Sequence, residues 1–245
     1  MGLLKNIFGK NEKTSQEERN NNSQIMMSNL CVCEQNLDKV LVNLSKSNKV
    51  NLLKHIAKVV LVMDYSGSME ELYLNGSVQR VITRLLPIAL KFDDDKKLES
   101  WLFSNREEQL ISVSINNYQD YVKKVMLKSK MSMGGTNYAP VLNAIINSLD
   151  KNNSIPTFVI FITDGENFDK KETNNVVKEL SEYNMFVQFI GIGNESFHYL
   201  RSLDDMPDRK YDNTGFTAVS DMNKMNDEEL YTELIRQYKD WLNSK

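Results

Sequence analysis

The chain has 245 residues, of which 26% are charged, and a formal net charge of −3 at pH 7. This length allows one large α/β domain with a short extension. The slightly acidic balance lacks the basic patch that binding to nucleic acid requires, and no apolar run approaches the roughly 20 residues of a membrane span.

The N-terminal part of the chain predicts two short segments ahead of the main domain. Residues 1–24 are predicted to be a flexible tail, because positions 9–24 are polar and show no apolar periodicity. The first ten residues carry an apolar face and two lysines, so contact of this tail with a membrane or a partner is an alternative.

Residues 25–47 are predicted to form a helical or hairpin extension. Apolar residues recur every three or four positions, as on one face of a helix, at Met26, Leu30, Cys33, Leu37, Val40 and Leu44. A short hairpin that turns at Ser47–Asn48 fits the end of this segment equally well, and both alternatives stay open.

The two cysteines, Cys31 and Cys33, are separated by one residue and are poorly placed to bridge each other. The histidines, His55 and His198, lie far away in sequence, so a zinc site is not expected. Two reduced thiols indicate a cytoplasmic protein.

From residue 57 onward, predicted strands alternate with predicted helices. The strands are expected at 57–63, 98–104, 108–114, 155–163, 185–193 and 215–219. The helices are expected at 77–92, 116–128, 137–150, 172–183, 195–205 and 226–244, the last with Asn226 or Asp227 as its N-cap. The strands at 57–63 and 155–163 are continuous apolar runs, which is typical of strands buried on both faces. The pattern predicts an α/β fold with a doubly wound, Rossmann-like, mainly parallel sheet of about six strands and helices on both faces.

Oxygen-bearing side chains gather where three of these segments end or begin. They are Asp64, Ser66 and Ser68 after the first strand, Thr136 after Gly134–Gly135, and Asp164 after the fourth strand. In a doubly wound sheet, sites form outside the carboxyl ends of the strands. Two carboxylates and three hydroxyls suit Mg²⁺, Mn²⁺ or Ca²⁺ rather than zinc or copper. Each segment alone is also explained by turn or capping chemistry, and only their combination favours a metal site.

These motifs resemble the metal-ion-dependent adhesion site of von Willebrand factor A domains. The matching stretches are Asp-x-Ser-Gly-Ser-Met at 64–69, Gly-Gly-Thr at 134–136 and Thr-Asp-Gly at 163–165. Stretches such as "NLLKHIAKVVLVMDYSGSM", "FVIFITDGEN" and "LDDMPDRKYDNTGF" are similar to the TerF-type A domains, which accompany bacterial tellurium-resistance and stress-response systems. The resemblance covers residues 48–245, and the residues before position 48 are too few for the TerD-like domain that full TerF-type proteins can carry.

The resemblance implies a Mg²⁺ ion held directly by Ser66, Ser68 and Thr136, with Asp64 and Asp164 bound to it directly or through intervening ligands. It also implies a protein partner that presents a carboxylate at the metal face, and therefore a metal-dependent interaction module without enzymatic activity.

Two other functions compete with this interpretation. A Mg²⁺-dependent phosphohydrolase of the haloacid-dehalogenase type needs Asp-x-Asp after the first strand, and serine stands at position 66. A scaffold protein would use the metal only to stabilise its fold, and its partner binding would survive mutation of Thr136.

Overall fold

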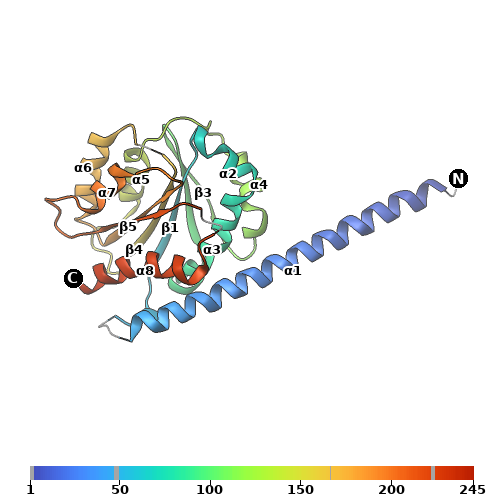
Figure 1. Cartoon of the computed structure of the whole chain (residues 1–245), viewed down its shortest axis with the longest axis horizontal. Helices are drawn as coiled ribbons and strands as arrows, with labels where there is room; N and C mark the ends of the chain where they lie inside the picture. The colour runs from blue at the N-terminus through green and yellow to red at the C-terminus, as the bar shows by residue number, and fades with distance from the viewer. Residues whose placement is uncertain (1–2, 47–49, 166, 222–223) are drawn as a thin grey trace.

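The computed structural model describes residues 3–46, 50–165, 167–221 and 224–245. Its centre is a six-stranded sheet in the order β3-β2-β1-β4-β5-β6 (Figure 1). The strands are β1 (Lys58–Asp64), β2 (Leu98–Phe103), β3 (Glu107–Val113), β4 (Thr157–Thr163), β5 (Met185–Ile192) and β6 (Thr214–Val219). Neighbouring strands are parallel except β2 and β3. The predicted doubly wound, mainly parallel sheet is confirmed.

Helices cover both faces of this sheet. They are α1 (Leu3–Ser45), α2 (Glu70–Leu74), α3 (Ser77–Phe92), α4 (Tyr121–Lys124), α5 (Ala139–Ser148), α6 (Lys170–Leu180), α7 (His198–Asp204) and α8 (Asp227–Asn243). Short 3-10 turns are η1 (Leu52–Lys54), η2 (Gly67–Met69), η3 (Tyr118–Asp120) and η4 (Met126–Lys128). None of the helices in the described part of the chain has the length and apolar character needed to cross a membrane.

Between their polar end residues, the central strands β1 and β4 are apolar because each of their faces meets a layer of helices. In β1, Leu61 packs in the core that α1, α3 and α8 share, while Val62 packs in the core beneath α5 and α6. Every residue of β4 is buried. The strand order reverses between β1 and β4, which places the crevice of a doubly wound sheet at their carboxyl ends.

The N-terminal segment differs from its prediction, because α1 runs unbroken from Leu3 to Ser45. A helix therefore stands where a flexible tail was expected over residues 1–24, of which residues 1–2 lie outside the described residues. Residues 3–45 contain no proline and a single glycine, and their Lys, Glu, Gln and Arg residues have good helix propensity. Of the two alternatives for residues 25–47, the helix is observed as far as Ser45, and the turn at Ser47–Asn48 falls outside the described residues.

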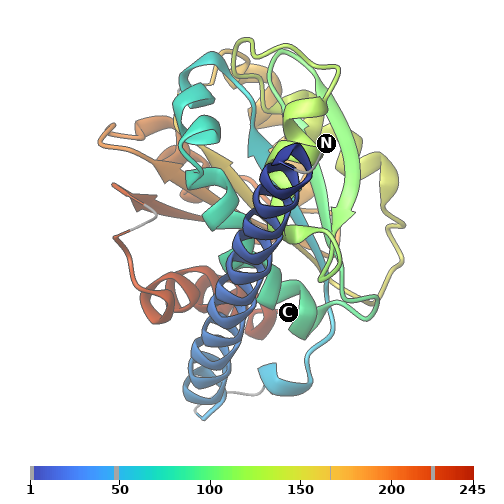
Figure 2. The ribbon, with the colours of Figure 1, turned by 90° about the vertical axis from the view of Figure 1, so that its right-hand side faces the viewer.

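The helix α1 is about 65 Å long at 1.5 Å per residue. Its C-terminal half crosses the domain, where Leu30, Leu37 and Leu41 are buried in the core shared with α3 and α8. Its N-terminal half extends beyond the rest of the molecule in Figure 1, and in Figure 2 the helix lies in front of the domain with its N-terminus toward the viewer.

The segment 116–128 also differs from its prediction, because it forms η3, α4 and η4 instead of one helix. In a continuous helix the Val122 N–H would donate to the Tyr118 carbonyl. Both backbone groups bond to the Gln79 side chain instead. Its Nε2 donates to the Tyr118 carbonyl at 2.5 Å, and its Oε1 accepts from the Val122 N–H at 3.1 Å.

The last helix begins as predicted, with Asn226 as its N-cap. The Asn226 side chain accepts from the Glu229 N–H at 2.9 Å, and the Glu229 carboxylate accepts from the Asn226 N–H at 3.3 Å. This reciprocal capping box satisfies backbone donors at the start of α8.

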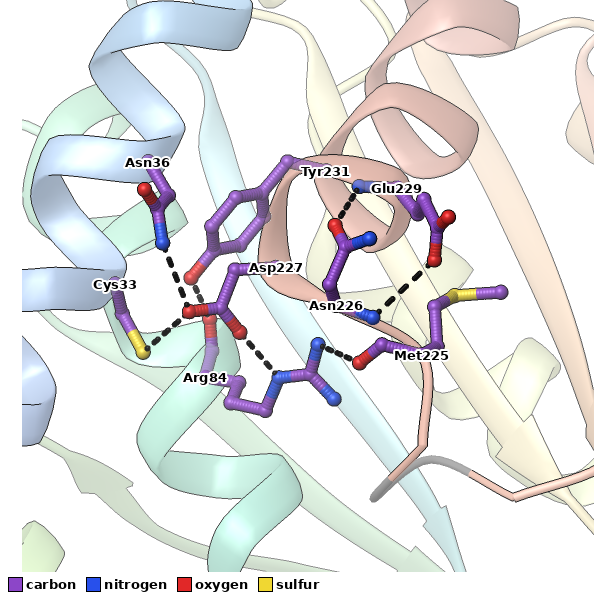
Figure 3. Close-up of polar contacts among 8 residues, drawn as sticks. All are labelled: Cys33, Asn36, Arg84, Met225, Asn226, Asp227, Glu229 and Tyr231. Carbon is purple, nitrogen blue, oxygen red and sulfur yellow. Dashed lines mark hydrogen bonds and ion pairs between the residues drawn. The ribbon is translucent and has the colours of Figure 1, made fainter.

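The next residue, Asp227, joins three helices (Figure 3). One carboxylate oxygen accepts from Arg84 Nε of α3 at 2.7 Å. The other oxygen accepts from Asn36 Nδ2 at 3.3 Å and from Cys33 Sγ at 3.4 Å, both on α1. The start of α8 is therefore held to α3 and to α1 through a single side chain.

Candidate metal site

Three loops meet at the carboxyl edge of the sheet, beside the ends of β1 and β4. Ser66 forms an isolated parallel bridge with Gly134, and the Gly67 N–H donates to the Gly134 carbonyl at 3.2 Å. The loop after β4 joins them, because the Phe168 N–H donates to the Thr136 carbonyl at 2.9 Å. The structure thus brings together the three segments that carry the predicted site residues.

Asp64 ends β1 and is fully buried. One carboxylate oxygen accepts from the Ser66 N–H at 2.8 Å, and the other accepts from the Thr163 hydroxyl at 2.6 Å. Burial raises the pKa of Asp64 from 3.8 to about 6, although both hydrogen bonds oppose the rise. The site thus holds a carboxylate whose negative charge lacks a compensating cation among these contacts.

A short chain of hydroxyl groups connects the first loop to Asp164. The Ser66 and Ser68 hydroxyl oxygens lie 3.1 Å apart, and the Ser68 hydroxyl donates to the Asp164 carboxylate at 2.9 Å. Burial raises the pKa of Asp164, and the charge of Glu195 adds to the rise. Four of the five predicted metal ligands are therefore connected to one another by hydrogen bonds.

Thr136 is buried, and its side chain lies next to the loop after β4. A Cβ atom added to Gly165 would lie 3.8 Å from the Thr136 hydroxyl oxygen, so this hydroxyl is close to the residue that follows Asp164. Thr136 does not cap α5, because the Asp169 carboxylate accepts from the Tyr138 and Ala139 N–H groups, each at 2.9 Å. The capping role that could explain Thr136 belongs to another residue.

Residues to which the sequence assigned no role hold these loops in place. Thr163 orients Asp64, and Asp169 holds the start of α5. The Asn105 side chain accepts from the Gly135 N–H at 2.8 Å, and a Cβ at Gly135 would come within 2.5 Å of the same oxygen. Only Thr163 leaves a local signal, a polar residue at the last position of an apolar strand.

The five donors offer two carboxylates and three hydroxyls, all of them hard oxygen ligands. Within the residues that the structure describes, no three His, Cys, Asp or Glu side chains lie close enough to hold a metal ion. A divalent cation at this site would therefore need the hydroxyl groups as further ligands. Its positive charge would offset the negative charge of the buried carboxylates. The donor set fits Mg²⁺, Mn²⁺ or Ca²⁺.

Metal binding at this site is expected to weaken as the pH falls. Protons compete with the metal for Asp64, whose pKa is about 6 in the metal-free protein. Because the carboxylate is largely ionised at pH 7 and largely protonated at pH 5, the apparent affinity for Mg²⁺ should fall about tenfold between these values. Calorimetric titrations at pH 5, 6, 7 and 8 measure this directly, and equal affinity at pH 5 and pH 7 would contradict the role of Asp64.

Comparison with known families identifies the domain that carries this site. A family model described as the A domain found in the C terminus of TerF matches residues 56–245. The chain belongs to the TerF-like von Willebrand factor A domains. The matched region begins just before β1 and ends with α8, so α1 lies outside it.

A relative of similar length is the uncharacterized protein YcbR of Bacillus subtilis. It is 35% identical to this chain over 198 residues, which cover 79% of this chain and 81% of the relative.

Solved structures share the fold of this A domain. Proximal thread matrix protein 1 from the mussel byssus, whose metal-ion-dependent adhesion site is occupied by zinc, aligns with a TM-score of 0.55 and 16% identity. The alignment covers 74% of this chain and 46% of the mussel protein. The manganese-loaded TRAP protein of Plasmodium vivax aligns with a TM-score of 0.50 and 18% identity, over 75% of this chain and 73% of that protein.

Proposed function

We propose that this A domain binds a protein partner through a divalent metal ion, with a carboxylate of the partner as one ligand of the metal. The observation that carries the proposal is the convergence of Asp64, Ser66, Ser68, Thr136 and Asp164 on one edge of the sheet. Two carboxylates neutralise a divalent ion and three hydroxyls add ligands without charge, which leaves the ion able to attract a further carboxylate.

Ser66, Ser68 and Thr136 would hold the ion directly, and Asp64 and Asp164 would bind it directly or through intervening ligands. Mg²⁺ is the proposed ion, with Mn²⁺ or Ca²⁺ as alternatives, because every donor is oxygen. The zinc and manganese in the named A-domain structures support a divalent ion in this fold.

The proposed setting is a bacterial tellurium-resistance or stress-response system in the cytoplasm. The TerF-like family match supports the system. Two free cysteines, Cys31 and Cys33, support a reducing compartment.

A binding module is favoured over a phosphohydrolase by the side chain at position 66. The Ser66 hydroxyl lies 3.1 Å from the Ser68 hydroxyl, at the position where a haloacid-dehalogenase-type enzyme needs a carboxylic acid as proton donor.

Thr136→Val tests the proposal, because valine keeps the shape of threonine and removes only the hydroxyl. We expect the variant to fold as the wild type does in EDTA and to bind Mg²⁺ at least tenfold more weakly in a calorimetric titration. A matched control is Thr232→Val on α8, which removes a hydroxyl that donates to the Glu228 carbonyl and should leave Mg²⁺ binding unchanged.

Two outcomes would contradict the proposal. One is a wild-type protein that does not bind Mg²⁺, Mn²⁺ or Ca²⁺ saturably at one site. The other is a Thr136→Val variant that binds metal and partner as the wild type does, which would favour a scaffold with a structural metal.

A further inference from the structure

A large aromatic side chain stands exposed next to the candidate metal site. Phe168 is 77% exposed, and among the side chains from residue 21 onward whose exposure the structure describes, no large apolar one is more exposed. A Cβ added to Gly135, the residue before Thr136, would lie 3.4 Å from the Phe168 ring, so the ring lies against the loop that supplies Thr136. An exposed aromatic residue loses contact with water when a partner covers it, and such residues are enriched among the main contributors to binding.

The polypeptide holds Phe168 in a fixed position. Its N–H donates to the Thr136 carbonyl at 2.9 Å. On one side, buried Asn167 donates to Asp169 at 2.6 Å and to the Thr173 hydroxyl at 3.0 Å. On the other side, the Asp169 carboxylate is fixed at the start of α5. Because both neighbours are anchored to helices, the backbone of Phe168 is already ordered, and only the side-chain torsions of the ring lose freedom when a partner binds.

The charges around the site limit what else the partner can carry. Glu70 and Glu71 are exposed in the first turn of α2, which follows Ser68 after one residue. Glu195 is also exposed, and it lines a small pocket together with Gly165, the residue after Asp164. An acidic partner surface would be repelled by these carboxylates, whereas a single carboxylate aimed at the metal would not.

We propose that Phe168 is a specificity-determining contact, and that the partner is a protein segment with one acidic residue and a large apolar side chain beside it. The carboxylate binds the metal while the apolar side chain covers the Phe168 ring. This inference rests on the proposed metal-dependent function and adds to it the chemistry of the partner.

A peptide selection tests this inference without knowledge of the natural partner. A displayed library of random 12-residue peptides is bound to the full-length, Mg²⁺-saturated protein and eluted with EDTA. We expect the eluted peptides to share one Asp or Glu and a large apolar residue at a constant distance from it.

Synthetic copies of these peptides are then measured by fluorescence anisotropy against variants. Phe168→Ala should bind them at least tenfold more weakly, Phe168→Leu should restore part of the affinity, and both should bind Mg²⁺ as the wild type does. Ile111→Ala is the matched control, because Ile111 is also apolar and 64% exposed. It lies on the edge strand β3, in the part of that strand that pairs with the start of β2. This variant should bind the peptides as the wild type does.

The outcomes separate this inference from the proposed function. Peptides that elute with EDTA but bind Phe168→Ala as tightly as the wild type would overturn the role of Phe168 alone. Peptides that depend on Phe168 but not on Mg²⁺ would support the aromatic contact and contradict the metal-dependent function. A library that yields no EDTA-sensitive peptide would contradict both.

Discussion

Replacing Asp64 with asparagine is expected to abolish Mg²⁺ binding and to stabilise the metal-free protein. Burial raises the pKa of Asp64 from 3.8 to about 6, so the folded state holds the proton more tightly than the unfolded state does. The free energy of unfolding therefore falls as the pH rises through this range. The full penalty, about 3 kcal/mol, is present at pH 7. Asparagine carries no charge and avoids it.

The hydrogen bonds of Asp64 can largely be kept in this variant. The asparagine carbonyl oxygen can still accept from the Ser66 N–H, and the Thr163 hydroxyl can rotate to accept from the new amide. Because this exchange is imperfect, we expect a net gain of about 1–3 kcal/mol in EDTA at pH 7. A metal-site residue that costs stability in the metal-free state is a common trade-off between function and stability.

Urea unfolding in EDTA and in saturating Mg²⁺ measures both effects. The wild type should gain about 2.7 kcal/mol at a Mg²⁺ concentration 100 times its dissociation constant, and Asp64→Asn should gain nothing. Asp93→Asn is the matched control, since Asp93 is a buried carboxylate that accepts from the Val59 N–H near the other end of β1. Its response to Mg²⁺ should match the wild type. An Asp64→Asn variant that is less stable than the wild type in EDTA would contradict the argument.

The same feature of the sequence, its apolar runs, was sufficient to predict both the sheet and the grouping of the site residues. Apolar runs such as 57–63 and 155–163 identify buried parallel strands, and parallel strands place their carboxyl ends at one edge. Asp64 and Asp164, which end or follow such strands, could therefore be placed together without a structure. Their binding of a metal remains a prediction.

What could not be predicted depends on contacts between residues distant in sequence. Gln79 interrupts the helix expected at 116–128 by bonding to its backbone from α3. Asp169 holds the start of α5 from the loop after β4. The N-terminal helix was missed for a different reason, because a polar composition without periodicity fits a solvated helix as well as a flexible tail.

The second large effect is expected from Asp227→Ala, which should destabilise the protein by about 3 kcal/mol. Asp227 and Arg84 form an ion pair at 2.7 Å, with their side chains only 17% and 12% exposed. Alanine would remove the carboxylate that pairs with the largely buried Arg84 guanidinium, which is more costly than losing an exposed pair. It would also remove the acceptor for Asn36 and Cys33 (Figure 3).

The neighbouring residue supplies a matched control for this prediction. Glu228 also pairs with α1, through Lys39 at 3.1 Å, but the two side chains are 53% and 61% exposed. Glu228→Ala should therefore change the free energy of unfolding by about 0–1 kcal/mol in urea titrations. Hydrogen exchange should then show faster exchange in the C-terminal half of α1 for Asp227→Ala and not for Glu228→Ala. If both variants are equally stable and α1 stays protected, the apolar contacts of Leu30, Leu37 and Leu41 are sufficient to hold α1. If only Asp227→Ala releases it, a helix outside the family's A domain depends on the first residue of α8 for its attachment.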